Sequence, residues 1–279
     1  MKIGLSLGGG GARGYAHLGV IRALKEADIP IDLINGTSIG AVMGGGYALY
    51  NDVDKFINLV TQVIHKSNIN YYNIFHNHSD SQSFLRTWML EAVCDIASLR
   101  SSIQSNRHQL KALRAVFGEH TFAETKIPFS SVAHDLISGK TVIFKKGKLV
   151  DGILPSVTLP GIFPPVRRRN RLLVDGYVLS NTPVHELRMQ GADFIIAVEL
   201  ISADKHTYEN GLDILNGIED MKQRQLDDWQ IAEADFHIKV DFEQYTPERF
   251  ENYENAMILG YNTTKASLTG LLEMLEKNG

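Results

Sequence analysis

The sequence has little cysteine and no long apolar runs, and each shortage excludes a class of protein. Cys94 is the only cysteine among 279 residues, so neither an intramolecular disulfide nor a cysteine-rich metal site can form. No uninterrupted apolar stretch approaches the length of about 20 residues that a membrane-spanning helix needs. After Lys2, only Ile3, Leu5 and Leu7 precede the first run of glycines, which is too short for an export signal. We therefore expect a cytoplasmic protein, with any membrane contact peripheral and at the inner face.

Strong charge of one sign is also missing. Lys and Arg number 28 and Asp and Glu number 32, which gives a formal net charge of −4 and offers no global reason to expect nucleic-acid binding. The composition is 44% hydrophobic and 22% charged, as in an ordinary globular protein. We expect no metal and no cofactor, and the oligomeric state stays open.

The beginning of the chain alternates between short apolar runs and helical patterns. The patterns predict a strand, a glycine-rich turn, a helix, a second strand and a second helix, over residues 2–7, 8–14, 15–27, 31–35 and 39–50. This order implies a parallel sheet with helices packed on it. We therefore expect an α/β fold with a mainly parallel central sheet and helices on both faces.

The rest of the chain divides into three parts by its patterns. We expect a catalytic domain over residues 1–200, with a helical insertion at about 53–117. Residues 201–279 predict a mostly helical C-terminal extension packed on the same domain. Residues 73–113 mix aromatic and polar side chains, which is typical either of a lid that admits an acyl chain or of a helix that covers the core.

Ser38 stands at the junction of the second predicted strand and the helix that follows it. Gly36 and Gly40 lie two residues before and two residues after it, which is the spacing of a nucleophile elbow. Small residues at those positions let the strand and the helix pack closely around a strained serine. The pattern G-x-S-x-G also occurs by chance, so it indicates a nucleophile only together with the strand–turn–helix context.

The glycine loop at residues 9–14 has two interpretations. As G-x-G-x-x-G after a strand it fits a dinucleotide fingerprint, which also requires an acidic residue at the end of the second strand. Asp32 lies near the start of that strand, and the serine elbow occupies its end. The second interpretation is an oxyanion hole built from backbone N–H groups, in which Arg13 adds positive charge or braces the loop. Its candidate residues are Gly9, Gly10, Gly11, Arg13 and Gly14.

A nucleophilic serine needs a residue that accepts its proton. Nine of the ten histidines follow Ser38, and none of them stands in a loop at a predicted strand end. Asp175 ends the predicted strand 172–175, so its carboxylate should emerge at the carboxyl edge of the sheet, where ligands bind. Asp175 and Gly176 also form an Asp-Gly pair, which is common in hairpin turns. An aspartate with an ordinary pKa of about 3.9 is a poor base at neutral pH, so we expect burial to raise the pKa of Asp175.

Five sequence elements, in this order, resemble those of the patatin-like phospholipase family, whose members are acyl hydrolases with a Ser-Asp dyad. They are the glycine loop, the serine elbow, the proline-rich segment 159–165, the Asp175-Gly176 pair and the segment 181–184. The resemblance covers about residues 5–190 and implies a three-layer catalytic core. It also implies that Ser38 and Asp175 hydrolyse lipid or phospholipid carboxylic esters. Tyr177 departs from the family, which usually has glycine or alanine there, and this puts the size of the substrate in doubt. The alternative is a non-catalytic lipid-binding or regulatory protein that retains the fold.

A cluster of arginines precedes Asp175 in the sequence. Its members are Arg167, Arg168, Arg169 and Arg171. Near an anionic bilayer each of them would contribute about 1 kcal/mol, so they are candidate headgroup contacts. The alternative is a solvated hairpin tip.

Overall fold

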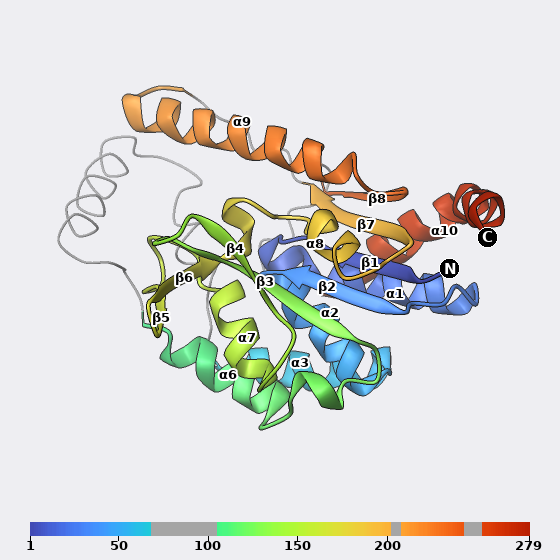
Figure 1. Ribbon diagram of the computed structural model, residues 1–279, viewed down its shortest axis with the longest axis horizontal. Helices are drawn as coiled ribbons and strands as arrows, with labels where there is room; N and C mark the ends of the chain where they lie inside the picture. The colour runs from blue at the N-terminus through green and yellow to red at the C-terminus, as the bar shows by residue number, and fades with distance from the viewer. Residues whose placement is uncertain (68–104, 202–207, 243–252) are drawn as a thin grey trace.

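The computed structural model describes residues 1–67, 105–201, 208–242 and 253–279 (Figure 1). In this part of the chain, one sheet contains β1 (Ile3–Leu7), β2 (Leu33–Thr37), β3 (Phe129–Asp135), β4 (Lys140–Phe144), β5 (Val166–Arg168), β6 (Arg171–Asp175), β7 (Phe194–Ile201) and β8 (Phe236–Asp241). Its order is β5-β6-β3-β2-β1-β7-β8, and β4 also pairs with β3. The five strands β3, β2, β1, β7 and β8 run parallel, so the predicted mainly parallel sheet is confirmed.

Helices cover both faces of the sheet, which confirms the expected layered α/β architecture. On one side α1 (Tyr15–Glu26), α2 (Ile39–Tyr50), α7 (Leu149–Ser156) and α10 (Tyr253–Asn278) pack on the strands or on one another, with α3 (Val53–Ser67) and α6 (Arg107–Phe117) outside them. On the other side lie α8 (Val184–Arg188) and α9 (Gly211–Ile231) (Figure 1). The main core lies between the sheet and the first group of helices.

The second strand lies two residues further along the chain than the pattern predicted. Asp32 is held before the strand begins, because its N–H donates to the Ile3 carbonyl and its carboxylate accepts from the Ile3 N–H, at 2.8 and 2.7 Å. Pairing with β1 then continues to Gly36, opposite Leu7. The strand therefore runs directly into Ser38 without an intervening loop.

Helix α7 was not predicted, because Gly152 and Pro155 obscure its pattern. Gly152 is required by packing: a Cβ at this position would lie 2.6 Å from the ring of Phe122. Pro155 lies in the last turn of the helix, near the end. The helix ends at Ser156, whose buried side chain contributes to the candidate site described below.

The C-terminal residues add to both the sheet and a helical layer. Strand β8 extends the sheet beyond β7, and α10 packs closely against α1 (Figure 1). The close approach depends on glycine, because a Cβ on Gly19 would lie 2.0 Å from the Met257 carbonyl oxygen and one on Gly260 2.2 Å from that of Ala16.

The segment that was interpreted as a lid or a core-covering helix lies mostly outside the described residues, which resume at residue 105. The described end of this segment belongs to α6, which buries Leu113. Val116 and Phe117, which come after the segment in the same helix, are also buried in the core. The lid therefore stays a prediction. None of the helices in the described ranges combines the length and apolarity needed to cross a membrane.

Candidate active site

Two strand ends meet on one edge of β3. Strand β4 pairs with the opposite edge of β3. Strands β2 and β6 therefore share the first edge: β2 pairs with the first part of β3 and β6 with its last part. They approach from opposite directions, so that Thr37 pairs with Val132 and Asp175 with the next residue, Ala133. Asp175 therefore arrives beside Ser38 on an antiparallel strand. From the sequence we expected Asp175 at the carboxyl edge of the sheet; it lies beside Ser38, but on a strand that runs antiparallel to β3.

Ser38 has the strained backbone that a nucleophile elbow requires. Its φ and ψ are 54° and −123°, a conformation that costs a non-glycine residue about 1–3 kcal/mol. The flanking glycines leave no room for a side chain: a Cβ on Gly36 would lie 2.4 Å from the Gly40 carbonyl carbon, and one on Gly40 2.2 Å from the Leu7 carbonyl oxygen. The elbow glycines thus let β2 and α2 pack tightly around the serine.

A hydrogen bond from Ser156 that the sequence did not indicate also holds this turn. The Ser38 N–H donates to the Ser156 Oγ at 3.0 Å, and Ser156 is fully buried. The last residue of α7 therefore provides an acceptor for the backbone N–H of the strained Ser38. Sequence reasoning missed Ser156 because α7 itself was not predicted.

The Ser38 hydroxyl donates to a buried carboxylate. Its Oγ lies 2.7 Å from Asp175 Oδ2, and the Tyr177 N–H donates to Asp175 Oδ1 at 3.0 Å. Burial raises the pKa of Asp175 from 3.8 to about 7, although the hydrogen bonds from Tyr177 and Ser38 lower it. Asp175 is 1% exposed, so a half-buried hydroxyl faces a carboxyl group that exchanges a proton near neutral pH.

Asp175 and Gly176 do not form a hairpin turn. They lead into a short 3-10 helix, Gly176–Val178, and a Cβ on Gly176 would lie 2.6 Å from the Val132 carbonyl oxygen. Tyr177 is half-buried, and its pKa is raised by burial first and then by Asp175, Glu219 and Asp220. The tyrosine therefore lies between Asp175 and the acidic residues of α9.

No histidine in the described ranges forms a hydrogen bond with Ser38 or Asp175. His17 is buried instead beneath the glycine loop, where its Nε2 donates to the Gly8 carbonyl oxygen at 2.8 Å. Burial lowers the pKa of His17 to about 4, so this histidine is neutral at physiological pH. It braces the loop rather than contacting the serine.

The predicted oxyanion residues take different positions in the glycine loop. Gly9 lies against the serine, since a Cβ on it would be 3.5 Å from Ser38 Cβ, but its N–H donates to the Asn181 carbonyl oxygen at 3.1 Å. The N–H groups of Gly10 and Gly11 have no acceptor among the described residues. These two are therefore among the loop donors that remain available.

Arg13 and Gly14 support the loop by other means. The Arg13 Nε donates to the Gly10 carbonyl oxygen at 3.1 Å, which matches the bracing alternative. A Cβ on Gly14 would lie 2.1 Å from Ile39 Cγ1. Gly14 thus lets the loop pack against the start of α2.

A second buried carboxylate, not indicated by the sequence, is connected to the loop through Asn181. The Asn181 Nδ2 donates to Asp227 Oδ2 at 3.1 Å, and the Gln223 Nε2 donates to Asp227 Oδ1 at 3.0 Å. Burial raises the pKa of Asp227 to about 7, against these two amide donors. In the sequence, Asp227 looks like one of many charged residues on a surface helix, so no local signal could have identified it.

The arginine cluster lies away from the serine, on the β5–β6 hairpin. All four arginines are exposed, and Arg169 has the positive φ of a tight turn, 53°. Strand β6 separates Arg171 from Asp175 by four residues, or about 13 Å. The arginines therefore lie on an exposed hairpin, and their contact with headgroups stays a prediction.

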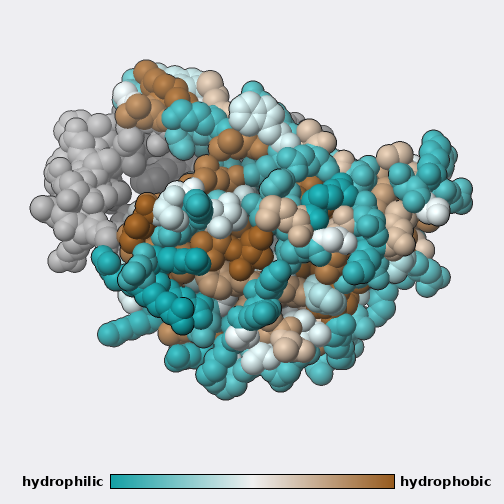
Figure 2. Space-filling model, viewed as in Figure 1, coloured by the Kyte–Doolittle hydropathy of each residue, from teal (hydrophilic) through white to brown (hydrophobic). Residues whose placement is uncertain are grey.

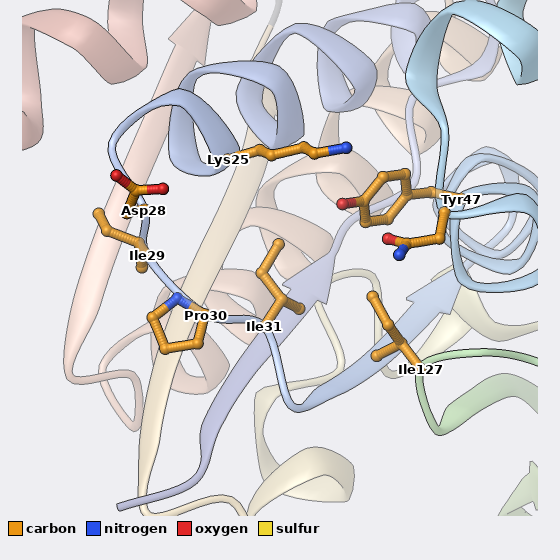
Figure 3. Close-up of a pocket in the computed structure, with 8 residues that line it drawn as sticks. Lys25, Asp28, Ile29, Pro30, Ile31, Tyr47 and Ile127 are labelled. Atoms are coloured by element: carbon orange, nitrogen blue, oxygen red, sulfur yellow. The ribbon is translucent and has the colours of Figure 1, made fainter.

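The opposite end of the sheet carries a surface hollow of about 360 Å³. Figure 3 shows that its walls come from the end of α1, the approach to β2, the end of α2 and the approach to β3. Asp32, which the dinucleotide interpretation would need at the serine end, also lies at this amino end. Within the described residues, no three His, Cys, Asp or Glu side chains are grouped so that they could hold a metal ion.

Comparison with known proteins identifies relatives over most of the chain. The family model described as patatin-like phospholipase matches residues 5–188. A lysophospholipase NTE1 of Yarrowia lipolytica is 32% identical over 215 residues, which are 77% of this chain and 14% of that protein. An uncharacterized NTE family protein of Mycobacterium bovis is 34% identical over 199 residues, which are 71% of this chain and 49% of that protein. The chain thus spans less than half the length of these relatives.

Two solved structures share the fold at low sequence identity. Human GIVD cytosolic phospholipase A2 matches with a TM-score of 0.56 and 11% identity, over 99% of this chain and 59% of that one. VipD from Legionella pneumophila matches with a TM-score of 0.54 and 16% identity, over 99% of this chain and 67% of that one.

Proposed function

Since the chain belongs to the patatin-like phospholipase family, we propose that it hydrolyses carboxylic esters of lipids through Ser38 and Asp175. The observation that carries the proposal is the 2.7 Å hydrogen bond from the Ser38 hydroxyl to a buried carboxyl group whose pKa is raised to about 7. A carboxylate with this pKa is a competent general base near neutral pH. Phospholipids are the substrate class that the family description and the names of the relatives suggest.

The first half of the reaction forms an acyl-enzyme. Asp175 accepts the proton of the Ser38 hydroxyl while Ser38 Oγ bonds to the ester carbonyl carbon, and the carbonyl oxygen becomes an oxyanion. The N–H groups of Gly10 and Gly11, for which the described residues provide no acceptor, stabilise that oxyanion, and each donor of this kind contributes about 3 kcal/mol to lowering the barrier. The tetrahedral intermediate then expels the alcohol, which takes the proton from Asp175.

The second half releases the fatty acid. Asp175 accepts a proton from water as the water oxygen attacks the acyl carbon, and the Ser38 oxygen leaves with that proton. The strain at Ser38 and its bond to Ser156 keep the hydroxyl at the end of the elbow throughout. The expected cytoplasmic location stays a prediction.

A panel of p-nitrophenyl esters and phospholipids tests the proposal, with Ser38→Ala and Asp175→Asn as inactive variants. Ser267→Ala, which changes a serine on α10 far along the chain from the elbow, is the matched control. We expect hydrolysis by the parent and by the control only. A folded parent that hydrolyses none of these esters would favour the alternative of a non-catalytic lipid-binding or regulatory protein.

A further inference from the structure

Helix α9 turns its polar side to the protein and its apolar side to solvent. The side that is buried or half-buried is mostly polar: beside Leu226 and Ile231, it carries Asp213, Asp220, Gln223, Asp227 and Gln230. The exposed side carries Ile214, Leu215, Ile218, Met221 and Trp229, which we call the apolar face of α9. At 3.6 residues per turn these five fall within an arc of about 120°, which they share with the exposed side chains of Lys222 and Gln225. A surface helix normally buries its apolar stripe, so the arrangement in α9 is reversed.

The polar side fixes α9 beside the candidate active site. Asp227 binds Asn181, whose carbonyl oxygen holds the Gly9 N–H. The Gln230 Nε2 donates to the carbonyl oxygen of Leu179, just after the Asp175 turn. The reversed polarity is therefore no sign of a loosely attached helix, since its contacts with the protein are specific hydrogen bonds.

A second element presents exposed apolar side chains close to the arginine cluster. The turn between β3 and β4 exposes Leu136 and Ile137, at 52% and 65%. The Leu136 N–H donates to the Leu172 carbonyl oxygen at 2.8 Å, which places this turn next to Arg171. Apolar and basic side chains thus lie together at the tip of the sheet.

Both elements lie at the same end of the molecule. In Figure 1, the first half of α9 and the β5–β6 hairpin project to the left, in the direction to which the carboxyl ends of β2 and β3 point. Figure 2 shows hydrophobic atoms over that half of α9 and hydrophilic atoms around the hairpin. Ser38 lies at the carboxyl end of β2, on the side of the sheet from which both elements project.

We propose that the apolar face of α9, with Leu136 and Ile137, docks on an anionic phospholipid surface. The four arginines of the β5–β6 hairpin contact the phosphates of that surface. This inference rests on the proposed function, because it names the source from which a lipid ester reaches Ser38. Aliphatic and Trp side chains of an interfacial helix enter the boundary between headgroups and acyl chains, and guanidinium groups pair with phosphate oxygens. Pairing of this surface with itself in a second copy would instead bring two arginine clusters to one interface.

Flotation with lipid vesicles tests the docking surface. The vesicles contain phosphatidylglycerol mixed into phosphatidylcholine, and every protein carries Ser38→Ala so that the lipid stays intact. The test variant combines Leu215→Glu with Met221→Glu, two positions that are 65% and 60% exposed. Ile258→Glu on α10, 57% exposed, is the matched control. Because all three positions are exposed, none of these changes should lower thermal stability.

We expect the bound fraction to fall about tenfold or more in the test variant and to stay unchanged in the control, because binding scales with buried apolar area. The proposal would be overturned if the Ser38→Ala protein did not float with the vesicles. It would also be overturned if the test variant and the control variant floated equally. A dimer that the test variant abolishes without any change in flotation would also overturn it, in favour of a second copy. Hydrolysis of a soluble p-nitrophenyl ester by the same variants with Ser38 restored reports on the proposed function separately, since that reaction needs no docking.

Discussion

Replacing Asp175 with asparagine should abolish ester hydrolysis and yet stabilise the fold at neutral and alkaline pH. The asparagine can bond to the same two groups: its oxygen accepts from the Tyr177 N–H, as Asp175 Oδ1 does, and its amide group donates to the Ser38 Oγ, which reverses the direction of that bond. What the variant lacks is the charge. In the parent, Asp175 is buried and becomes charged above pH 7. No cation contributes to the shift of its pKa, so no opposite charge offsets this cost.

The size of the effect follows from the difference between the folded and unfolded pKa. The pKa of Asp175 rises from 3.8 to about 7 on folding, and about 3 units at 1.36 kcal/mol each give about 4 kcal/mol. Because the folded pKa is the higher one, the folded state holds the proton between pH 4 and pH 7 while the unfolded state loses it. The stability of the parent therefore falls as the pH rises through this window, and the full cost is present above pH 7.

Urea unfolding of both proteins at pH 5 and pH 8 measures this effect. We expect the advantage of Asp175→Asn to grow between the two pH values toward about 4 kcal/mol, while kcat/KM falls by about 1000-fold or more. Asp135→Asn is a control whose stability should change in the opposite direction. The Leu172 N–H, followed by the Ser138 hydroxyl, donates to Asp135 and lowers its pKa. That control should lose stability at pH 8. Equal pH dependence in the parent and in Asp175→Asn would refute the burial argument.

Four further results are expected. The kcat/KM of the parent for a p-nitrophenyl ester should rise about tenfold per pH unit below pH 7 and level off above it, because Asp175 must be ionised to accept the proton; a flat profile from pH 5 to pH 8 would contradict this. Ser156→Ala should leave the Ser38 N–H without a partner and lower the free energy of unfolding in urea by about 1–3 kcal/mol. A lower kcat at unchanged substrate binding would indicate that Ser156 positions Ser38. Gly40→Ala should prevent folding as followed by circular dichroism, since its Cβ would lie 2.2 Å from a carbonyl oxygen. Gly211→Ala is the control, because its Cβ would meet nothing within 4 Å and its backbone is not in the positive-φ region, so it should change stability by less than about 1 kcal/mol. Replacement of the four hairpin arginines by glutamine should weaken vesicle flotation and reduce its dependence on salt, and equal salt dependence would exclude them as headgroup contacts.

The parts of the site that depend on short patterns could be predicted from the sequence. Gly36 and Gly40 mark the elbow because their lack of a side chain is a local requirement, and the glycine loop follows a strand in the same way. The fold class could also be predicted, since the β-turn-α order at the start of the chain restricts the topology strongly.

The parts that depend on tertiary packing could not be predicted in the same way. Asp175 could be proposed as the base from its position at a strand end, but it lies 137 residues from Ser38 along the chain, and their meeting depends on β2 and β6 sharing one edge of β3. Ser156 and Asp227 acquire their roles only when α7 and α9 pack beside the elbow and the glycine loop. The outward apolar face of α9 has the same origin, because a helical pattern alone predicts that the apolar side faces the protein.

The most direct test of the central claim is to map the site of reaction with a fluorophosphonate probe by peptide mass spectrometry. The Ser38–Asp175 account predicts a single adduct on the Oγ of Ser38, formed by the parent and strongly reduced in Asp175→Asn. An adduct on another serine, or equal labelling of Ser38 in both proteins, would contradict it.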